Sequence, residues 1–200
     1  TGLWITVLIA LFNAIAHAES VDGKQTNRED SVPPLTSVLV ETIELDTTVG
    51  KIKGRTDGEI ATFQGIPYAE APVGDNRWRP PIALQSFDTT LDATKFGSAC
   101  MQRRRTGYFA DPRPVSEDCL TLNIWSTNHI KKGKPVIVWI HGGAFVIGSS
   151  KFPFYDGEAF ARSGIVFVSI NYRLGRFGYF AHPALIDETK VSNFAYTVQV

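Results

Sequence analysis

The sequence predicts an α/β fold in which antiparallel strands lead into a parallel β-α-β unit. Two apolar runs, PVIVWI at 135–140 and IVFVSI at 165–170, are continuous and rich in β-branched residues, which is typical of strands buried on both faces of a parallel sheet. Between them, the segment DGEAFARS at 156–163 predicts a short helix that ends before Gly164. A strand, a helix and a second strand in this order are typical of a β-α-β unit.

Four shorter strand-like runs precede this unit, at 38–45, 50–55, 59–65 and 120–125. We expect the first two to form a hairpin. The alternation of apolar and polar residues in the last run predicts a half-buried strand. Because no convincing helix separates the four runs, we expect them to form an antiparallel entry to the sheet.

The N-terminal segment predicts export. Residues 2–16 are almost wholly apolar, and the run closes with Ala16-His17-Ala18. A short apolar run closed by an A-x-A pattern predicts a signal peptide, residues 1–18, cleaved after Ala18. The alternative is a retained membrane anchor, but the run is shorter than the roughly 20 residues that a membrane span needs. We therefore expect a secreted or periplasmic protein with no stable membrane span after signal removal.

The sequence after the predicted signal peptide divides into a leader and a folded domain. Residues 19–36 are polar and include Pro33-Pro34, which predicts a flexible leader, so residues 37–200 are expected to form the domain. The chain has 20 basic and 20 acidic residues. A formal net charge of zero gives no reason to expect nucleic acid or an anionic membrane surface as a partner.

The chain contains two cysteines, Cys100 and Cys119. An even number of cysteines in an exported chain favours a disulfide, and two unrelated buried thiols are the alternative. In the chain-entropy model, a bridge that closes a loop of this length contributes roughly 3 kcal/mol of stability.

The segment WIHGGAF at 139–145 is the strongest chemical signal. It follows directly on the first long apolar run, and its adjacent glycines allow a tight turn whose backbone N–H groups are not blocked by side chains. Such donors stabilise the negative charge that a carbonyl oxygen gains during acyl transfer, and loss of one donor costs on the order of 100- to 1,000-fold in rate. An ordinary turn is the alternative interpretation.

Five separate motifs, in one order, make the chain resemble the type-B carboxylesterase/lipase family, which includes cholinesterases and many bacterial esterases. The resemblance runs from about Thr48 to Pro183. The motifs are QGIPYA at 64–69, PVGDNRW at 72–78, SEDCLTLN at 116–123, HGGAF at 141–145 and NYRLG at 171–175. The resemblance implies an α/β-hydrolase fold, of which this chain would be the N-terminal part.

The resemblance also implies an oxyanion hole formed by Gly142, Gly143 and Ala144. In it, the N–H groups of Gly143 and Ala144 face the oxyanion, and Gly142 allows the turn. Alanine at the third position departs from the commoner glycine but keeps its N–H group. The chain order in this fold is Ser, then Asp or Glu, then His, so His141 comes too early to be the base. We expect His141 to fix the loop by hydrogen bonding instead.

Two structural pairs follow from the same resemblance. Cys100 and Cys119 match a family disulfide that holds a loop near the active site. Arg77 and Glu117 match a buried ion pair, for which the bidentate guanidinium of arginine is well suited. We also expect His182 to be structural and His129 to lie in an exposed polar loop.

The last residues depart from the family pattern. The family usually reads Gly-Asn-Tyr-Gly, two apolar residues, then Asp-Gln, whereas this chain reads SNFAYTVQ at 192–199. Asn193 and Gln199 fit, but Val198 stands where Asp is expected. In the family, that Asp pairs with the arginine that matches Arg173. We therefore expect Arg173 to lack its partner. A sequence error near the end of the chain, or a decaying gene, would explain the departure as well as real divergence.

No serine of this chain lies in a G-x-S-x-G context. Ser150 comes closest, with Gly148 two residues before it, but Phe152 stands where the second glycine should be. We therefore expect the catalytic Ser, acid and His to lie beyond Val200. The isolated chain should then be inactive and poorly folded, with an open apolar sheet edge.

The function implied by these observations is carboxylic ester hydrolysis of small-molecule esters through an acyl-enzyme. We expect no metal or nucleotide cofactor, since the chain contains no P-loop, no G-x-G-x-x-G after a strand and no clustered His and Cys. The alternative is a non-catalytic, cholinesterase-like adhesion or interaction protein, because a fold does not fix a function.

Overall fold

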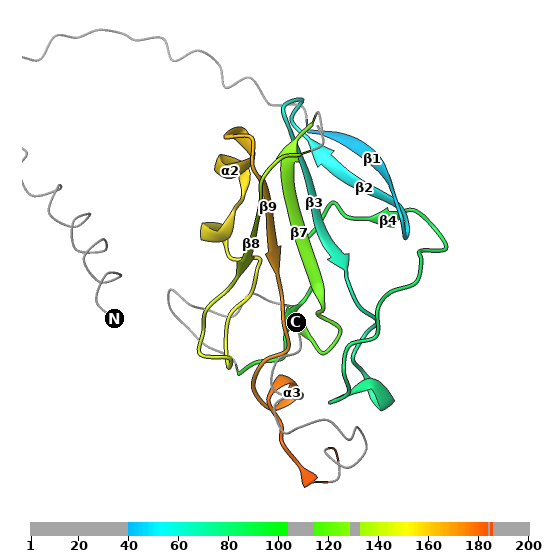
Figure 1. Ribbon diagram of the computed structural model, residues 1–200, viewed down its shortest axis with the longest axis vertical. Coiled ribbons are helices and arrows are strands. Elements are labelled where there is room, and N and C mark those ends of the chain that lie inside the picture. The colour runs from blue at the N-terminus through cyan, green and yellow to red at the C-terminus, as the bar shows by residue number, and fades with distance from the viewer. Residues whose placement is uncertain (1–39, 104–113, 129–132, 184, 186–200) are drawn as a thin grey trace, which may run out of the picture. The chain divides into compact units, whose positions relative to one another are not determined.

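A computed structural model describes residues 40–103, 114–128, 133–183 and 185 of the chain (Figure 1). The chain divides into two compact units, and all of the described residues lie in the second, Val38–Val200. The predicted signal peptide and leader, His129 and Val198 lie outside the described residues. Within those residues, no helix combines the length and the apolarity needed to cross a bilayer.

A mixed sheet of seven strands forms the framework of the described residues, in the order β1-β2-β3-β7-β9-β8, with β4 beside β2 (Figure 1). Neighbours from β1 to β9 pair antiparallel, whereas β8 pairs parallel with β9 and β4 parallel with β2. The predicted antiparallel entry is therefore confirmed. The strands are β1 (Glu41–Thr47), β2 (Gly50–Thr56), β3 (Ile60–Pro67), β4 (Leu91–Asp92), β7 (Thr121–Thr127), β8 (Val136–Ile140) and β9 (Val166–Ile170).

The predicted β-α-β unit is also confirmed. Helix α2 (Glu158–Arg162) connects β8 to β9 and packs on β7 and β9. Its Ala161 is fully buried against Trp125 and Phe167, and its Phe160 stacks on Phe167 with ring centroids 4.8 Å apart. Burial of these apolar side chains, rather than the propensity of a five-residue helix, stabilises α2.

The central strand β7 is packed on both faces and is therefore not the half-buried strand that the sequence predicts. Both of its faces are packed: Ile124 contacts a cluster that includes Ile52 and Phe63, and Trp125 lies in a separate cluster with Phe167. The polar Asn123 is only 1% exposed, while Ile124 is half-buried. The alternation therefore reflects a polar network on the Asn123 side, and not a solvent-facing side.

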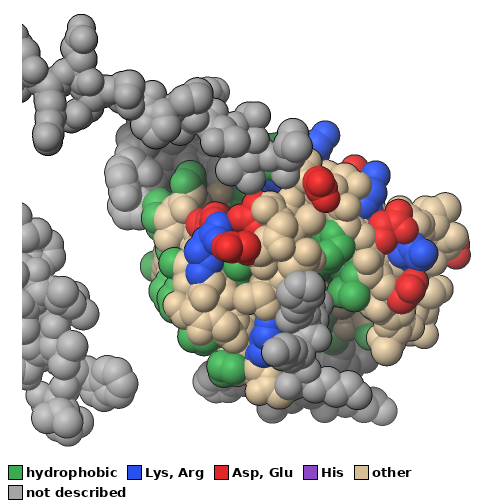
Figure 2. Space-filling view, turned by 90° about the horizontal axis from the view of Figure 1, so that it is seen from above, with side chains coloured by type: hydrophobic (Ala, Val, Ile, Leu, Met, Phe, Trp, Pro, Cys, Tyr) green, Lys and Arg blue, Asp and Glu red, His purple; other side chains and the backbone are tan. Residues whose placement is uncertain are grey.

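Strand β8 differs from its prediction as well. Its apolar run predicts burial on both faces, yet Val136, Val138 and Ile140 are 59%, 56% and 54% exposed. The reason is position, because β8 is the edge of the described sheet and pairs only with β9. Figure 2 shows hydrophobic side chains on the side of the molecule that bears β8 and α2. The expected open apolar edge is thus present in the described residues.

Several short elements were not predicted from the sequence. Strands β5 and β6 form a separate two-stranded parallel pair, and α3 follows β9 closely. These elements are η1 (Gly74–Asn76), β5 (Ala99–Cys100), β6 (Val115–Ser116), η2 (Pro153–Tyr155) and α3 (Gly175–Gly178).

Charges of both signs lie side by side on the visible face in Figure 2. Arg162 at the end of α2 contacts Asp57 at 2.7 Å and Glu158 at 2.6 Å, and it also pairs with Glu59. Exposed pairs of this kind contribute little to stability because water screens them.

Candidate active site

The loop after β8 has an unusual backbone conformation. Gly143, Ala144 and Phe145 have φ angles of 126°, 52° and 61°. Only glycine adopts such angles without steric cost, and a non-glycine residue held there costs on the order of 1–3 kcal/mol. The surrounding structure must therefore hold Ala144 and Phe145 in place, and backbone strain of this kind is concentrated at functional sites.

Gly143, and not Gly142, is the glycine that the turn requires. A Cβ atom at position 143 would lie 1.9 Å from the carbonyl oxygen of Ile147, which no side chain could tolerate. Among the described residues, a Cβ atom at position 142 would meet no atom within 4 Å, and Gly142 does not have a positive φ. The prediction that Gly142 allows the turn is therefore wrong.

The loop leaves a run of backbone donors free. The N–H groups of Val146 and Ile147 each donate to the Gly143 carbonyl oxygen at 3.1 Å. Within the described residues, the N–H groups of the four preceding residues, Gly142 to Phe145, donate no hydrogen bond. The run includes Gly143 and Ala144, and adjacent unpaired N–H groups on a turn are the arrangement that a developing oxyanion requires.

His141 holds the beginning of the loop. Its side chain is 2% exposed, its ring stacks on Tyr172 with centroids 4.5 Å apart, and its Nδ1 lies 2.9 Å from the Gly142 carbonyl oxygen. Burial lowers the pKa of His141, which outweighs the opposite effect of the Gly142 carbonyl. The neutral ring therefore donates through Nδ1 to Gly142, which agrees with the predicted role in fixing the loop.

A buried polar network lies behind the loop. Asn123 Nδ2 donates to the hydroxyls of Ser150 and Ser169, both at 3.0 Å. Asn171 Oδ1 accepts from the Ser150 N–H at 2.9 Å and from the Ser149 hydroxyl at 3.3 Å. Ser149 and Ser150 are 0% and 2% exposed, so their hydroxyls serve this network and do not face solvent.

Gln102 closes the other end of the loop, and no sequence signal singled it out. Its Nε2 donates to the Gly148 carbonyl oxygen at 2.8 Å, and its Oε1 accepts from the Gly148 N–H at 3.0 Å. Gly148 has φ 120°, and a Cβ atom there would lie 2.4 Å from His141 Nδ1. The two ends of the loop therefore pack against each other at Gly148.

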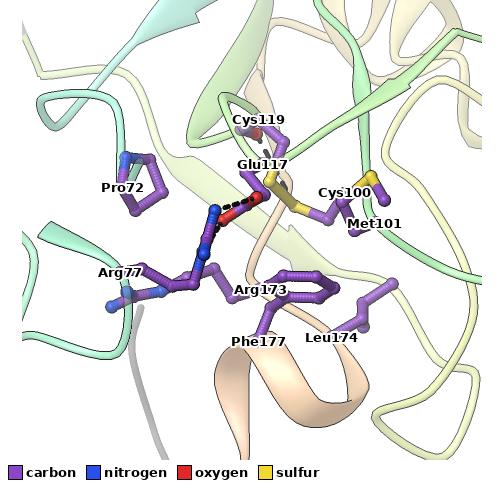
Figure 3. A pocket seen from close by; sticks show the side chains of 9 residues that line it. All are labelled: Pro72, Arg77, Cys100, Met101, Glu117, Cys119, Arg173, Leu174 and Phe177. Carbon is purple, nitrogen blue, oxygen red and sulfur yellow. Dashed lines mark hydrogen bonds and ion pairs between the residues drawn. A yellow bond between two sulfur atoms is a disulfide. The ribbon is translucent and has the colours of Figure 1, made fainter. Parts of the chain in front are cut away.

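The predicted disulfide is present in the structure, between Cys100 and Cys119. Beside it, Arg77 binds Glu117 through two hydrogen bonds, Nε to Oε2 at 2.5 Å and Nη2 to Oε1 at 2.7 Å (Figure 3). The Glu117 carboxylate raises the pKa of Arg77 through these bonds. The prediction of a buried pair is wrong, because the side chains are 38% and 20% exposed in the structure.

Arg173 lacks hydrogen-bond partners for much of its guanidinium group. The residue is 3% exposed, and its Nη2 donates to the Arg79 carbonyl oxygen at 2.9 Å. In the described part of the chain, its Nε and Nη1 have no partner. Burial lowers the pKa of Arg173 to about 10, so the group still carries its charge at pH 7. Because Val198 lies outside the described residues, the expectation that Arg173 lacks its family partner stays a prediction.

The family model described as "Carboxylesterase family" matches residues 41–196. The chain belongs to the carboxylesterase family. It is 44% identical over 144 residues to fumonisin B1 esterase of Sphingopyxis macrogoltabida, and 42% identical over 151 residues to para-nitrobenzyl esterase of Bacillus subtilis. These matches cover 72% and 74% of this chain but 26% and 30% of the relatives, so the chain spans less than a third of their length.

Solved carboxylesterase structures show the same architecture. The chain matches a structure of PNB esterase with a TM-score of 0.67 and 37% identity, covering 76% of this chain and 32% of that one. A carboxylesterase of Geobacillus stearothermophilus matches with a TM-score of 0.65 and 38% identity, over 77% and 30% of the two chains. The described sheet is therefore part of the α/β-hydrolase fold. These names do not favour the alternative of a non-catalytic adhesion protein.

A pocket of about 640 Å³ in this carboxylesterase chain lies beside the loop. Val146 and Ile147 form one wall directly after the free N–H groups, and Leu174 and Phe177 add further apolar surface. Arg103 and Arg176 also line the pocket, and no acidic side chain among the described residues does so.

No group of three or more His, Cys, Asp or Glu within the described ranges could hold a metal ion.

Proposed function

We propose that the whole protein hydrolyses carboxylic esters, with the N–H groups of Gly143 and Ala144 as oxyanion donors. The observation that supports this most directly is that these two N–H groups belong to a run of donors without a partner among the described residues, on the strained turn. A serine hydroxyl would attack the ester carbonyl carbon while a base takes its proton, and the resulting alkoxide would accept hydrogen bonds from both donors. Collapse of this intermediate breaks the bond to the alcohol oxygen, which takes the proton from the base and leaves as the alcohol. The remaining acyl-enzyme is then hydrolysed by water to the acid.

We further propose that residues outside this 200-residue chain supply the nucleophile, the acid and the base. Two observations support this. Ser149 and Ser150, the serines closest in sequence to the loop, are buried in the asparagine network, and His141 is buried and bound to Gly142. In addition, the curated relatives are more than three times as long as the segments that match.

For the substrate, we propose a small-molecule ester that places one side in the pocket beside the loop. The apolar wall of Val146, Ile147 and Phe177 suits an acyl or alcohol chain. Arg103 and Arg176 favour an ester that also bears an anionic group, because both are exposed at the pocket and no acidic side chain among the described residues opposes them there. Relatives named for fumonisin B1 and for phenmedipham make those two compounds candidate substrates.

The test compares the whole protein with residues 1–200 alone on p-nitrophenyl butyrate. We expect turnover by the whole protein that a serine-directed fluorophosphonate abolishes, and none by the 200-residue chain. A whole protein without turnover would refute the esterase assignment, and fluorophosphonate-sensitive turnover by the short chain would refute an external nucleophile. The variant Arg176→Gln tests the preference for anionic esters. Its turnover of p-nitrophenyl hemisuccinate should decline relative to its turnover of p-nitrophenyl butyrate.

We also propose that the protein is exported, with a signal peptide at residues 1–18. The apolar run closed by Ala16-His17-Ala18 supports this, and so does the disulfide, because disulfides persist in oxidising compartments. Mass spectrometry of the mature protein should find Glu19 at its N-terminus. A mature protein that retains residues 2–16 would contradict cleavage.

A further inference from the structure

We propose that Gln102 is a positioning residue, which sets the orientation of the oxyanion loop by binding the Gly148 peptide through both ends of its amide. This inference rests on the proposed esterase function. The side chain donates to the Gly148 carbonyl oxygen at 2.8 Å and accepts from the Gly148 N–H at 3.0 Å. One planar amide thus satisfies both backbone groups of a residue 46 positions away, as a neighbouring strand would.

Gln102 is itself held in place. Its Nε2 also donates to the Cys100 carbonyl oxygen at 3.1 Å, and Cys100 is covalently joined to Cys119. Cys119 lies two residues before Thr121, where the central strand β7 begins. The amide therefore connects the loop to a fixed part of the sheet.

The position of Gly148 determines that of the donors through close contacts. The Ile147 carbonyl oxygen lies 1.9 Å from the place that a Cβ on Gly143 would occupy, so Ile147 is packed directly against the Gly143 backbone. The Ile147 N–H also binds the Gly143 carbonyl oxygen at 3.1 Å. A shift of the peptide that joins Ile147 to Gly148 would therefore turn the Gly143 peptide, whose orientation aims the neighbouring N–H groups.

The effect should appear in the chemical step. Displacement of a catalytic group by about 1 Å can cost on the order of 100-fold in rate, whereas uniform binding of substrate and transition state affects KM alone. Because Gln102 also lines the pocket, a direct contact with substrate is the competing explanation. Loss of a contact of that kind would raise KM, so the division between kcat and KM distinguishes the two roles.

The experiment uses Gln102→Met, which keeps length but removes the two hydrogen bonds to Gly148 and the one to the Cys100 carbonyl oxygen. It also uses Gln102→Glu, which keeps the acceptor for the Gly148 N–H but places a carboxylate oxygen against the Gly148 carbonyl oxygen. Gln85→Met is the matched control, because exposed Gln85 makes, within the described residues, only a 3.4 Å contact with the Ala83 carbonyl oxygen. In the whole protein, we expect both Gln102 variants to lower kcat for p-nitrophenyl butyrate by about 10- to 100-fold, with KM within about threefold.

Two further measurements isolate the oxyanion donors. Affinity for a trifluoromethyl ketone, whose adduct bears an oxyanion, should fall with kcat in the Gln102 variants and stay constant in Gln85→Met. Amide hydrogen exchange over residues 141–150 should accelerate in the Gln102 variants alone. Unchanged kcat, or a loss confined to KM, would overturn the inference. If the wild-type protein has no esterase activity, the proposed function fails, and unchanged exchange in Gln102→Met would separately overturn the positioning role.

Discussion

Replacement of Gly143 by alanine should destabilise the protein severely. The backbone at this position has φ 126°, and a Cβ atom would meet the Ile147 carbonyl oxygen at 1.9 Å. A strained φ costs on the order of 1–3 kcal/mol, and overpacking typically adds about 1–3 kcal/mol. The clash involves backbone rather than a flexible side chain, so the loop must rebuild. We therefore expect Gly143→Ala to lower the free energy of unfolding by about 2–6 kcal/mol.

Gly142→Ala is the control for this prediction. It adds the same methyl group one residue earlier, where a Cβ atom meets no atom of the described part of the chain within 4 Å. We expect the free energy of unfolding to stay within about 1 kcal/mol of wild type. Urea unfolding of the whole protein, followed by tryptophan fluorescence and compared at equal m-values, measures both variants. Equal losses in the two variants, or a larger loss in Gly142→Ala, would refute the assignment of the turn to Gly143.

Three further predictions use the same unfolding measurement. Replacement of Cys100 and Cys119 together by alanine should lower the free energy of unfolding by about 3 kcal/mol, and a loss below about 1 kcal/mol would contradict a structural disulfide. Glu117→Gln should shift the urea midpoint far less, because water screens the half-exposed pair with Arg77; a shift as large as that of the cysteine variant would contradict this. Stability should fall as pH drops below about 6.5, since burial lowers the pKa of His141 and the unfolded chain then binds more protons. His141→Gln should remove that component, and an unchanged slope would contradict it.

The elements that the sequence predicted correctly are those with strong local patterns. The runs at 135–140 and 165–170 and the helical segment between them became β8, β9 and α2. The solvent exposure of β8 could not be predicted in the same way. An apolar run indicates a strand that suits burial, but the position of that strand within the sheet depends on which neighbours are present.

The sequence predicted some parts of the site and not others. The HGGAF motif located the loop, but two adjacent glycines look alike in a sequence, and only the backbone angle identifies Gly143 as the residue that must lack a Cβ. Asn123 and Asn171 lay within recognisable motifs, whereas Gln102 did not. Its contacts with Gly148 join residues far apart in the chain, and periodicity and turn signals contain no information on such pairs.

The side chains that hold the loop after β8, residues 141–150, have a consequence for protein engineering. They come from three other segments: Gln102 follows the β5 strand, Asn123 lies on β7, and Asn171 follows β9. A loop grafted into another protein of the α/β-hydrolase fold as residues 141–150 alone would leave these three amides behind. The transferable module is therefore the loop together with its distant amide partners, and directed evolution of the loop should find compensating changes at Gln102, Asn123 and Asn171.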